Sequence, residues 1–230
     1  MAQVQPAVNR FITDISKLER KLQKDLRSVV RNMSRLSDTQ LINAIGQLNL
    51  FNEIIEQGYG DALNGLDKEY ETLLTKAISE ATKRGVTPLS GAGLQGLETL
   101  RELNTAELLG RARVHSNRLT SAIFQNLYAG VSVNDTIKVL EGIPLAGFQL
   151  ETLTYTGIKT FDDAARYKVF EGLDVKWTYF GPLDDRTRDS CRKTKEKEPE
   201  GGYTEKQALN SGTPFGIRGG FNCRHSWEVR

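Results

Sequence analysis

The sequence has no long apolar run, no excess of one charge and no signal-like start, and each absence excludes a class of protein. No stretch reaches the roughly 18 apolar residues of a membrane-spanning helix, so no membrane segment is expected. Residues 1–9 lack the basic and then apolar pattern of a secretory signal, which favours a chain that is cytosolic at synthesis. Lys and Arg number 31 against 29 Asp and Glu, a formal charge of +2, so composition alone does not indicate a nucleic-acid-binding protein.

Cysteine is scarce, and the two cysteines, Cys191 and Cys223, both lie in the last fifth of the chain. Intracellular thiols are kept reduced, so a disulfide at synthesis is not expected, although a particle that leaves the cell can oxidise the pair. Apolar residues make up 38% of the 230 residues, and the mean hydropathy is −0.43. These values fit one domain or two small ones with much helical surface and a modest core.

Residues 8–36 carry apolar side chains at intervals of three or four residues, separated by charged and amide side chains. This spacing predicts an amphipathic helix of about 30 residues, roughly 40 Å long. The seam is narrow and resembles that of a coiled coil, so the helix belongs to an intramolecular bundle, which we favour slightly, or to an intermolecular coil. The seam positions are Val8, Phe11, Ile15, Leu18, Leu22, Leu26, Val29, Met33 and Leu36.

Two more helices are expected after this first one. Ser37 and Gln40 have the spacing of a capping box, in which each side chain satisfies a backbone donor of the other residue. The helix that they open is expected to end at Gly58 and Gly60. A third helix is expected over about residues 61–83, and the short connections favour antiparallel neighbours.

Residues 85–96 hold four glycines and a proline, which predicts a turn or a loop. Within them, Gly91-x-Gly93-x-x-Gly96 matches a dinucleotide-binding fingerprint, but a helix precedes it where that motif requires a strand. We therefore interpret the glycines as part of a loop. Helical spacing of leucines resumes over residues 97–127.

A short helix is expected at residues 136–141 with Asn134 as its N-cap. Another helical stretch covers roughly residues 145–171, with Gly157 as a candidate break. His115 stands among polar neighbours, so we interpret it as a surface residue rather than a ligand or a base.

From residue 173 the composition changes to aromatic and β-branched residues and then to glycine-rich segments. Residues 175–180 predict a strand that ends at a Gly-Pro turn, and a second strand is expected around 223–229. A short helix near residues 204–210 is expected to begin at Thr204. The expected fold class is therefore α+β: a mainly helical region, 1–170, followed by a small, loop-rich C-terminal module, 171–230, with a few short β-strands.

The C-terminal module carries two dense motifs. The first is Gly181-Pro182-x-Asp184-Asp185-Arg186-Thr187-Arg188-x-x-Cys191, which follows Trp177. The second is Gly219-Gly220-Phe221-Asn222-Cys223-Arg224-His225. Together with Tyr203-Thr204 between them, these motifs resemble the C-terminal region of the Mu F-like minor head proteins of tailed bacteriophages. The resemblance covers about residues 150–230. The helices before residue 150 resemble the family only in being a variable helical portion. His225 stands where many members of the family have a second cysteine.

The resemblance implies a structural virion component, not an enzyme, that acts in head morphogenesis. Proteins of this family are associated with the portal or the inner capsid, so the implied partners are the portal protein, the major capsid protein and packaged DNA. Support for DNA packaging or ejection is implied in the same way, as is a location in the phage head after assembly in the host cytoplasm. The helical region is expected to supply the partner surface, and an oligomer is compatible with its seam.

Three interpretations of the module's cysteines stay open. In the first, which we favour, Cys191 and Cys223 are buried free thiols, and Asp184 and the arginines hold loop backbone by hydrogen bonds. In the second, Cys191, Cys223 and His225 bind a structural Zn²⁺ with Asp184 or Asp185 as the fourth ligand, which would stabilise a small module with little core. In the third, a Cys191–Cys223 disulfide closes a loop of about 30 residues, worth about 3–4 kcal/mol.

The charged residues of the motifs also allow two interpretations. Arg186, Arg188 and Arg224 either pair with Asp184, Asp185 and Glu228 or contact DNA phosphates, and the nearby carboxylates favour internal pairs. The mixed charges of residues 192–198 predict a solvated loop.

A catalytic alternative uses the same residues. Cys223 and His225 share one face if they lie on a strand, as a thiol nucleophile and its base would. Asp184 and Asp185 are the carboxylates for a metal-dependent, nuclease-like reaction on nucleic acid. No oxyanion-hole motif accompanies them, so the structural interpretation is favoured over the enzyme.

Overall fold

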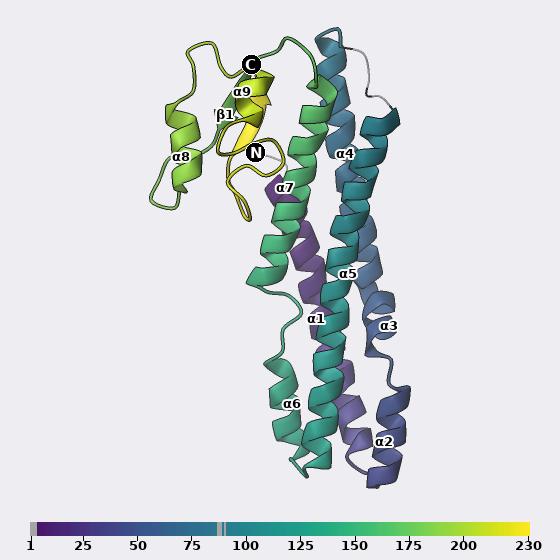
Figure 1. The fold of residues 1–230 in the computed structure, drawn as a ribbon. Helices are drawn as coiled ribbons and strands as arrows, with labels where there is room; N and C mark the ends of the chain where they lie inside the picture. Colours follow the sequence, from purple (N-terminus) through teal and green to yellow (C-terminus); the bar gives the residue numbers. More distant parts are fainter. Residues whose placement is uncertain (1–3, 87–88, 90) are drawn as a thin grey trace. The chain divides into compact units, whose positions relative to one another are not determined.

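The computed structural model describes residues 4–86, 89 and 91–230 (Figure 1). The helices are α1 Val4–Met33, α2 Asp38–Gln47, α3 Leu50–Ile54, α4 Gly60–Lys83, α5 Gly91–Tyr128, α6 Val133–Glu141, α7 Phe148–Phe170, α8 Asp189–Glu196 and α9 Glu205–Leu209. A π-helical turn, Ile55–Tyr59, connects α3 to α4, and the strands are β1 Trp177–Phe180 and β2 Ser226–Val229. The expected α+β class with a mainly helical body is confirmed. No helix in the described part of the chain is long and apolar enough to span a membrane.

The chain divides into two compact units that are not consecutive in sequence. One unit combines the described residues of 4–8, 67–104 and 152–230, and the other combines residues 9–66 and 105–151. The division falls inside α1, α4, α5 and α7. We call the unit that contains residues 152–230 the C-terminal unit and the other the helical unit. The expected boundary at residue 170 stays a prediction.

In the helical unit, α1 buries the stripe that its spacing predicts. Phe11, Ile15, Leu18, Leu22 and Leu26 are each at most 4% exposed, as an amphipathic helix with an inward face requires. The stripe then continues through Val30 rather than Val29, and Leu36 lies beyond the helix end and is exposed. The difference arises because a straight helix repeats every 3.6 residues, so a predicted seam with an average spacing of about 3.5 residues drifts off the buried face.

The segment after α1 differs from the single helix expected there. The capping box is present, with the Ser37 backbone N–H donating to Gln40 Oε1 at 3.0 Å. The helix stops after Gln47, and Asn49 starts the short α3 by accepting a hydrogen bond from the Asn52 backbone. Gly58 has φ +137° within the π-helical turn, so the glycines bend the chain directly into α4 instead of ending a helix in a loop.

The expected loop at 85–96 is shorter than predicted, because Gly91, Gly93 and Gly96 lie in the first turns of α5. Residues 87, 88 and 90 of that prediction lie outside the described residues. The dinucleotide interpretation stays unsupported, since the helix α4 precedes these glycines. The N-cap of α6 is Ser132, which accepts from the Asp135 backbone N–H at 3.1 Å, and not Asn134.

Gly157 does not break α7, which is continuous from Phe148 to Phe170. Asn104 of α5 donates to the Gly157 carbonyl at 3.2 Å, and a Cβ at residue 157 would lie 3.2 Å from the Asn104 side chain. The glycine therefore allows α5 and α7 to approach closely within the C-terminal unit, a role that sequence spacing alone does not distinguish from a break.

The C-terminal module contains the two strands, paired antiparallel with Trp177 opposite Val229 and Tyr179 opposite Trp227. Both strands are shorter than predicted. The Thr204 cap of α9 is confirmed, with a capping box to Gln207. Residues 192–196 of the expected solvated loop instead belong to α8, and residues 197–198 follow the helix end. Figure 1 shows α8, α9 and β1 gathered beside α7.

Aromatic rings fill the space between the strands, the loops and α7. Phe215 contacts Tyr167 of α7 in a stacked arrangement, with ring centroids 4.5 Å apart, and contacts Trp177 edge-on at 4.6 Å. Trp227 packs on Tyr203 and donates its indole N–H to the Thr213 carbonyl at 2.7 Å. These rings form the small core on which the motif loops rest.

Candidate metal centre

The first motif forms a loop that is closed by its own side chains. Asp184 accepts hydrogen bonds from the Arg186 backbone N–H at 3.0 Å and from the Thr187 hydroxyl at 3.2 Å. The Thr187 hydroxyl lies 2.9 Å from the Pro182 carbonyl and 2.9 Å from the Asp184 backbone nitrogen. The short polar side chains therefore replace regular secondary structure as partners of the loop backbone.

Asp184 also binds the second motif. The Arg224 guanidinium donates to both of its carboxylate oxygens, at 2.7 and 2.5 Å. The Arg224 hydrogen bonds hold the pKa of the Asp184 carboxyl well below its usual range. This bidentate pair confirms the internal pairing predicted for Arg224 and Asp184.

The other predicted pairs are not the ones observed. Arg188 donates to the Phe221 carbonyl at 2.6 Å, which ties the two motif loops together by backbone and not by a carboxylate. Glu228 lies 4.0 Å from Arg166 of α7. Asp185 is exposed and makes no hydrogen bond or ion pair in the described part of the chain.

The two motifs bring three metal-binding side chains together. The ligand atoms of Cys191, Cys223 and His225 all lie within 4.8 Å of one another, and all three residues are buried. Cys191 comes from the first turns of α8, and the other two come from the chain leading into β2. The two Sγ atoms are 3.7 Å apart and unbonded, and Cys223 Sγ lies 3.9 Å from His225 Nδ1.

The separation of the two sulfurs fits a tetrahedral Zn²⁺ site. With Zn–S bonds of about 2.3 Å, the edge between two sulfurs of a tetrahedron is about 3.8 Å, close to the observed separation. Two thiolates and an imidazole are the donor types that zinc prefers. Asp184, predicted as the fourth ligand, is not part of the group, because Arg224 and its own loop occupy its carboxylate.

Two glycines leave room for the cluster. A Cβ on Gly219 would lie 2.2 Å from Cys191 Sγ and 3.1 Å from Cys223 Sγ. A Cβ on Gly181 would lie 2.3 Å from the His225 ring. Backbone thus packs directly against both sulfurs and the imidazole, which only glycine permits.

The electrostatics of the cluster favour a thiolate at one cysteine. Burial alone raises the pKa of Cys223, but hydrogen bonds from His225, from the Gly219 backbone and from Cys191 outweigh it and lower the pKa to about 6. Burial raises the pKa of Cys191 instead. A thiolate is the form of cysteine that binds metal, so Cys223 is available as a ligand near neutral pH.

Tyr179 of β1 completes the surroundings of the cluster. Its hydroxyl lies 3.4 Å from Cys191 Sγ and 3.8 Å from Cys223 Sγ, and its ring stacks on His225 with centroids 5.1 Å apart. Burial raises the pKa of Tyr179 far above its usual range, so the phenol stays protonated and acts as a hydrogen-bond donor to sulfur. His225 Nε2 is buried and has no hydrogen-bond partner among the described residues.

A buried charge network holds the second motif against α7. Lys159 lies 3.2 Å from both Asp162 and Asp163, and Arg218 Nε lies 3.0 Å from Asp163 Oδ2, an ion pair outside hydrogen-bond geometry. Arg218 also donates to the Thr160 hydroxyl at 3.1 Å. Burial raises the pKa of the Asp163 carboxyl, against the lowering effect of Lys159 and Arg218. Because Arg218 precedes Gly219, this network fixes the backbone that faces the thiols.

Sequence reasoning missed Tyr179, Arg218 and the Lys159–Asp163 pair as supports of the site. Tyr179 is two residues from Trp177, so strand alternation already places the two side chains on one face. The network carries a weaker signal. Lys159, Asp162 and Asp163 are close together in α7 at a spacing that is also common on solvated helix faces, and Arg218 lies in a loop more than fifty residues further along the chain.

Comparison of the chain with protein-family models, with curated proteins and with solved structures finds no significant match in any of the three.

Proposed function

We propose that this chain is a minor head protein of a tailed bacteriophage, a structural part of the particle rather than an enzyme. The proposal starts from the resemblance of the two C-terminal motifs to Mu F-like proteins. The observation that supports it is that most of the motif residues contact one another. Asp184 binds Arg224, Arg188 binds the loop of the second motif, and Gly219 lies against both thiols.

A catalytic site would present its reactive groups to a substrate. The three cluster residues are at most 2% exposed, and backbone glycines cover the sulfurs and the imidazole. A pocket of about 460 Å³ lies beside Gly181 and Arg224, but none of the three cluster residues lines it. Asp185, which makes no hydrogen bond or ion pair among the described residues, is not part of the metal-binding group. These features favour a motif that stabilises a fold.

We further propose that Cys191, Cys223 and His225 hold a structural Zn²⁺. The module's core consists of a two-stranded sheet, two short helices and a few rings, and such small folds gain stability from a bound metal. The protein supplies three ligands and the Tyr179 hydroxyl donates toward the sulfurs, which supports ligand orientation from outside the coordination sphere.

Metal analysis of the purified full-length chain tests the zinc proposal. Freshly reduced protein prepared without chelator should contain about one equivalent of zinc, and Cys223→Ser should lose it together with the folded C-terminal module. Lys193→Ala, an exposed change on the same helix as Cys191, should keep both. Protein that contains no zinc and is equally stable with and without added zinc would show that the thiols are simply packed.

The partners proposed for this head protein are the portal and the major capsid protein, with packaged DNA as a contact inside the filled head. Deleting the gene from its phage should lower the infectious yield per assembled particle. The protein should co-sediment with proheads and resist external protease until the capsid is opened. A protein that is absent from purified heads, or digested while they are intact, contradicts this placement.

A further inference from the structure

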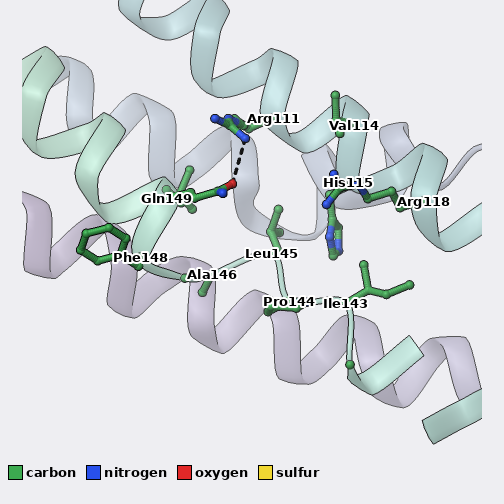
Figure 2. A pocket seen from close by; sticks show the side chains of 13 residues that line it. Arg111, Val114, His115, Arg118, Ile143, Pro144, Leu145, Ala146, Phe148 and Gln149 are labelled. Atoms are coloured by element: carbon green, nitrogen blue, oxygen red, sulfur yellow. Dashed lines mark hydrogen bonds between the residues drawn. The ribbon is translucent and has the colours of Figure 1, made fainter. Parts of the chain in front are cut away.

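A pocket of about 510 Å³ in the helical unit has no role in the proposals above. It lies between α5 and the segment that joins α6 to α7 (Figure 2). Arg111, His115 and Arg118 occupy one face of α5, four and three residues apart, so all three line the same side. The opposite side consists of backbone, mostly apolar side chains and the Gln149 amide from residues 142–150.

The joining segment is held in place by α1. The Glu19 carboxylate accepts hydrogen bonds from the backbone N–H groups of Leu145 at 2.9 Å and Ala146 at 3.3 Å. The helix α7 then begins at Phe148, with its first turn at the pocket. The walls are therefore formed by hydrogen-bonded structure, and the N-terminal end of a 23-residue helix contributes its positive dipole.

The charged side chains of the pocket are all cationic. No carboxylate lines it. Arg111 is oriented by a 3.2 Å hydrogen bond to the Gln149 side chain, whereas Arg118 makes no hydrogen bond or ion pair in the described part of the chain. The positive charge of both guanidiniums is therefore unneutralised by the protein.

The His115 side chain also lacks a hydrogen-bond partner among the described residues. It is only 6% exposed, points from α5 into the pocket in Figure 2, and forms no hydrogen bond within the described residues. Burial, followed by the charge of Arg118, lowers the pKa of His115 to about 4, so the ring is neutral at pH 7 and offers one N–H donor. The ring faces the pocket, so a ligand that enters the pocket can supply the hydrogen-bond partner that His115 lacks among the described residues. The interpretation of His115 as a surface residue is thus wrong.

We propose that this pocket binds the phosphate group of a nucleotide. Two guanidiniums and an imidazole N–H from successive turns require several acceptor oxygens, which a phosphate offers and a single carboxylate does not. Val114 and Phe148, 47% and 75% exposed, lie at the same pocket and provide apolar surface for a base. The phosphate belongs either to a free nucleotide or to a nucleic-acid strand.

Calorimetric titration of the full-length chain with adenosine 5′-monophosphate tests the proposal. Saturable binding is expected, and adenosine without phosphate should bind at least about tenfold more weakly, the size of a lost charge-assisted contact. Arg118→Gln and His115→Leu should each weaken binding by a similar factor. Arg113 is an exposed residue of the same helix, α5, and its guanidinium lies over the Phe51 ring of α3. Arg113→Gln should leave the affinity for the nucleotide unchanged.

His115→Leu also separates a ligand site from a merely tolerated histidine. The substitution removes an unpartnered buried polar group, so the free protein should be as stable as the wild type or more so while losing the nucleotide. A short single-stranded oligonucleotide that competes with the nucleotide, and loses affinity in Arg118→Gln, identifies a strand as the source of the phosphate. A non-competing oligonucleotide identifies the free nucleotide. No saturable binding of the nucleotide, or binding unaffected by Arg118→Gln and His115→Leu, overturns the proposal.

Discussion

At the scale of single residues, the cluster depends on backbone as much as on its ligands. Gly219 has no side chain at the point where Cys191 and Cys223 approach the main chain. Gly219→Ala would place a methyl group 2.2 Å from Cys191 Sγ, so either the loop or the thiol has to move. We predict that this variant loses zinc and unfolds at a lower temperature than the wild type.

Zinc content and thermal unfolding of Gly219→Ala check this prediction. Gly201→Ala is the matched control, because a Cβ there meets open space and the glycine needs no left-handed conformation. Equal zinc content and equal melting temperature in wild type and Gly219→Ala would mean that the cluster has more room than the geometry indicates.

The buried network provides a second residue-scale prediction. Arg218→Met leaves Asp163 fully buried with Lys159 as its remaining close cationic partner, and removing one member of a buried ion pair typically costs about 3–5 kcal/mol. Urea denaturation should show this loss, whereas Arg186→Met, at an exposed position, should change stability little. If Asp163→Asn in the same chain recovers none of the loss, the cost does not arise from the uncompensated carboxylate.

Asp184 makes stability depend on pH. Because Arg224 lowers the pKa of this carboxyl in the folded state, its contribution is fully present above the usual carboxyl pKa of about 4. The contribution is lost as the pH falls through the lower folded-state pKa. Asp184→Asn should therefore be less stable than the wild type at neutral pH, and the difference should shrink on acidification. Melting temperatures that run parallel from pH 7 into the acid range would refute the linkage.

At the scale of elements, α1 is the clearest case of a helix specified by its own spacing. Leu18 and Leu22 are 4% and 1% exposed, so replacing both by Asp puts charge into an apolar interface at a cost of several kcal/mol. The double variant should unfold at a lower denaturant concentration and lose association with heads. Arg20→Asp with Lys24→Asp, on the exposed face at the same spacing, should fold normally. A Leu18→Asp, Leu22→Asp protein that folds and still co-purifies with particles would exclude this helix as the docking element.

The elements that sequence reasoning found are those with apolar periodicity or a capping residue. The stripe of α1 and the boxes at Ser37 and Thr204 carry their information locally, in residues three or four positions apart. In contrast, α8 has charged residues on most faces and buries only Cys191 and Thr194, so its spacing gave no helix signal. Composition indicated a loop at these residues, but tertiary contacts stabilise a helix there.

Glycine was the main source of wrong element boundaries. Gly91, Gly93, Gly96 and Gly157 lie inside helices, and Gly58 bends the chain without ending its helical path. A glycine in a sequence indicates conformational freedom or close approach, and only the three-dimensional neighbours decide which. At Gly157 the neighbour is Asn104, more than fifty residues away, which no local pattern reveals.

The same limit applies to the candidate site. Cys191, Cys223 and His225 were predictable as one group because their residue types are the usual zinc ligands. The partner of Asp184 was not predictable, because whether its carboxylate binds a metal or Arg224 depends on how two loops fold. His115 was misjudged for a related reason: the charged residues around it in the sequence indicated an exposed position, whereas its own ring is buried.

At the scale of the whole molecule, the chain builds both compact units from separated segments. Residues 4–8, at the start of α1, belong to the same unit as residues 152–230. If the C-terminal motifs stabilise this unit, damage to them reduces the folded protein that is available for assembly. Stability and function in the particle are then coupled.

The central claim, that the motif residues are structural, is tested most directly by measuring incorporation into heads against the free energy of unfolding. The variants are Cys191→Ser, Cys223→Ser, His225→Ala and Asp184→Asn, with Asp185→Asn as the exposed control. We predict that incorporation and infectivity fall together as stability falls, and that Asp185→Asn matches the wild type. Variants that are stable and incorporated at wild-type levels yet yield non-infectious particles would contradict the account, because losing a nucleophile or a base lowers a rate and not a fold.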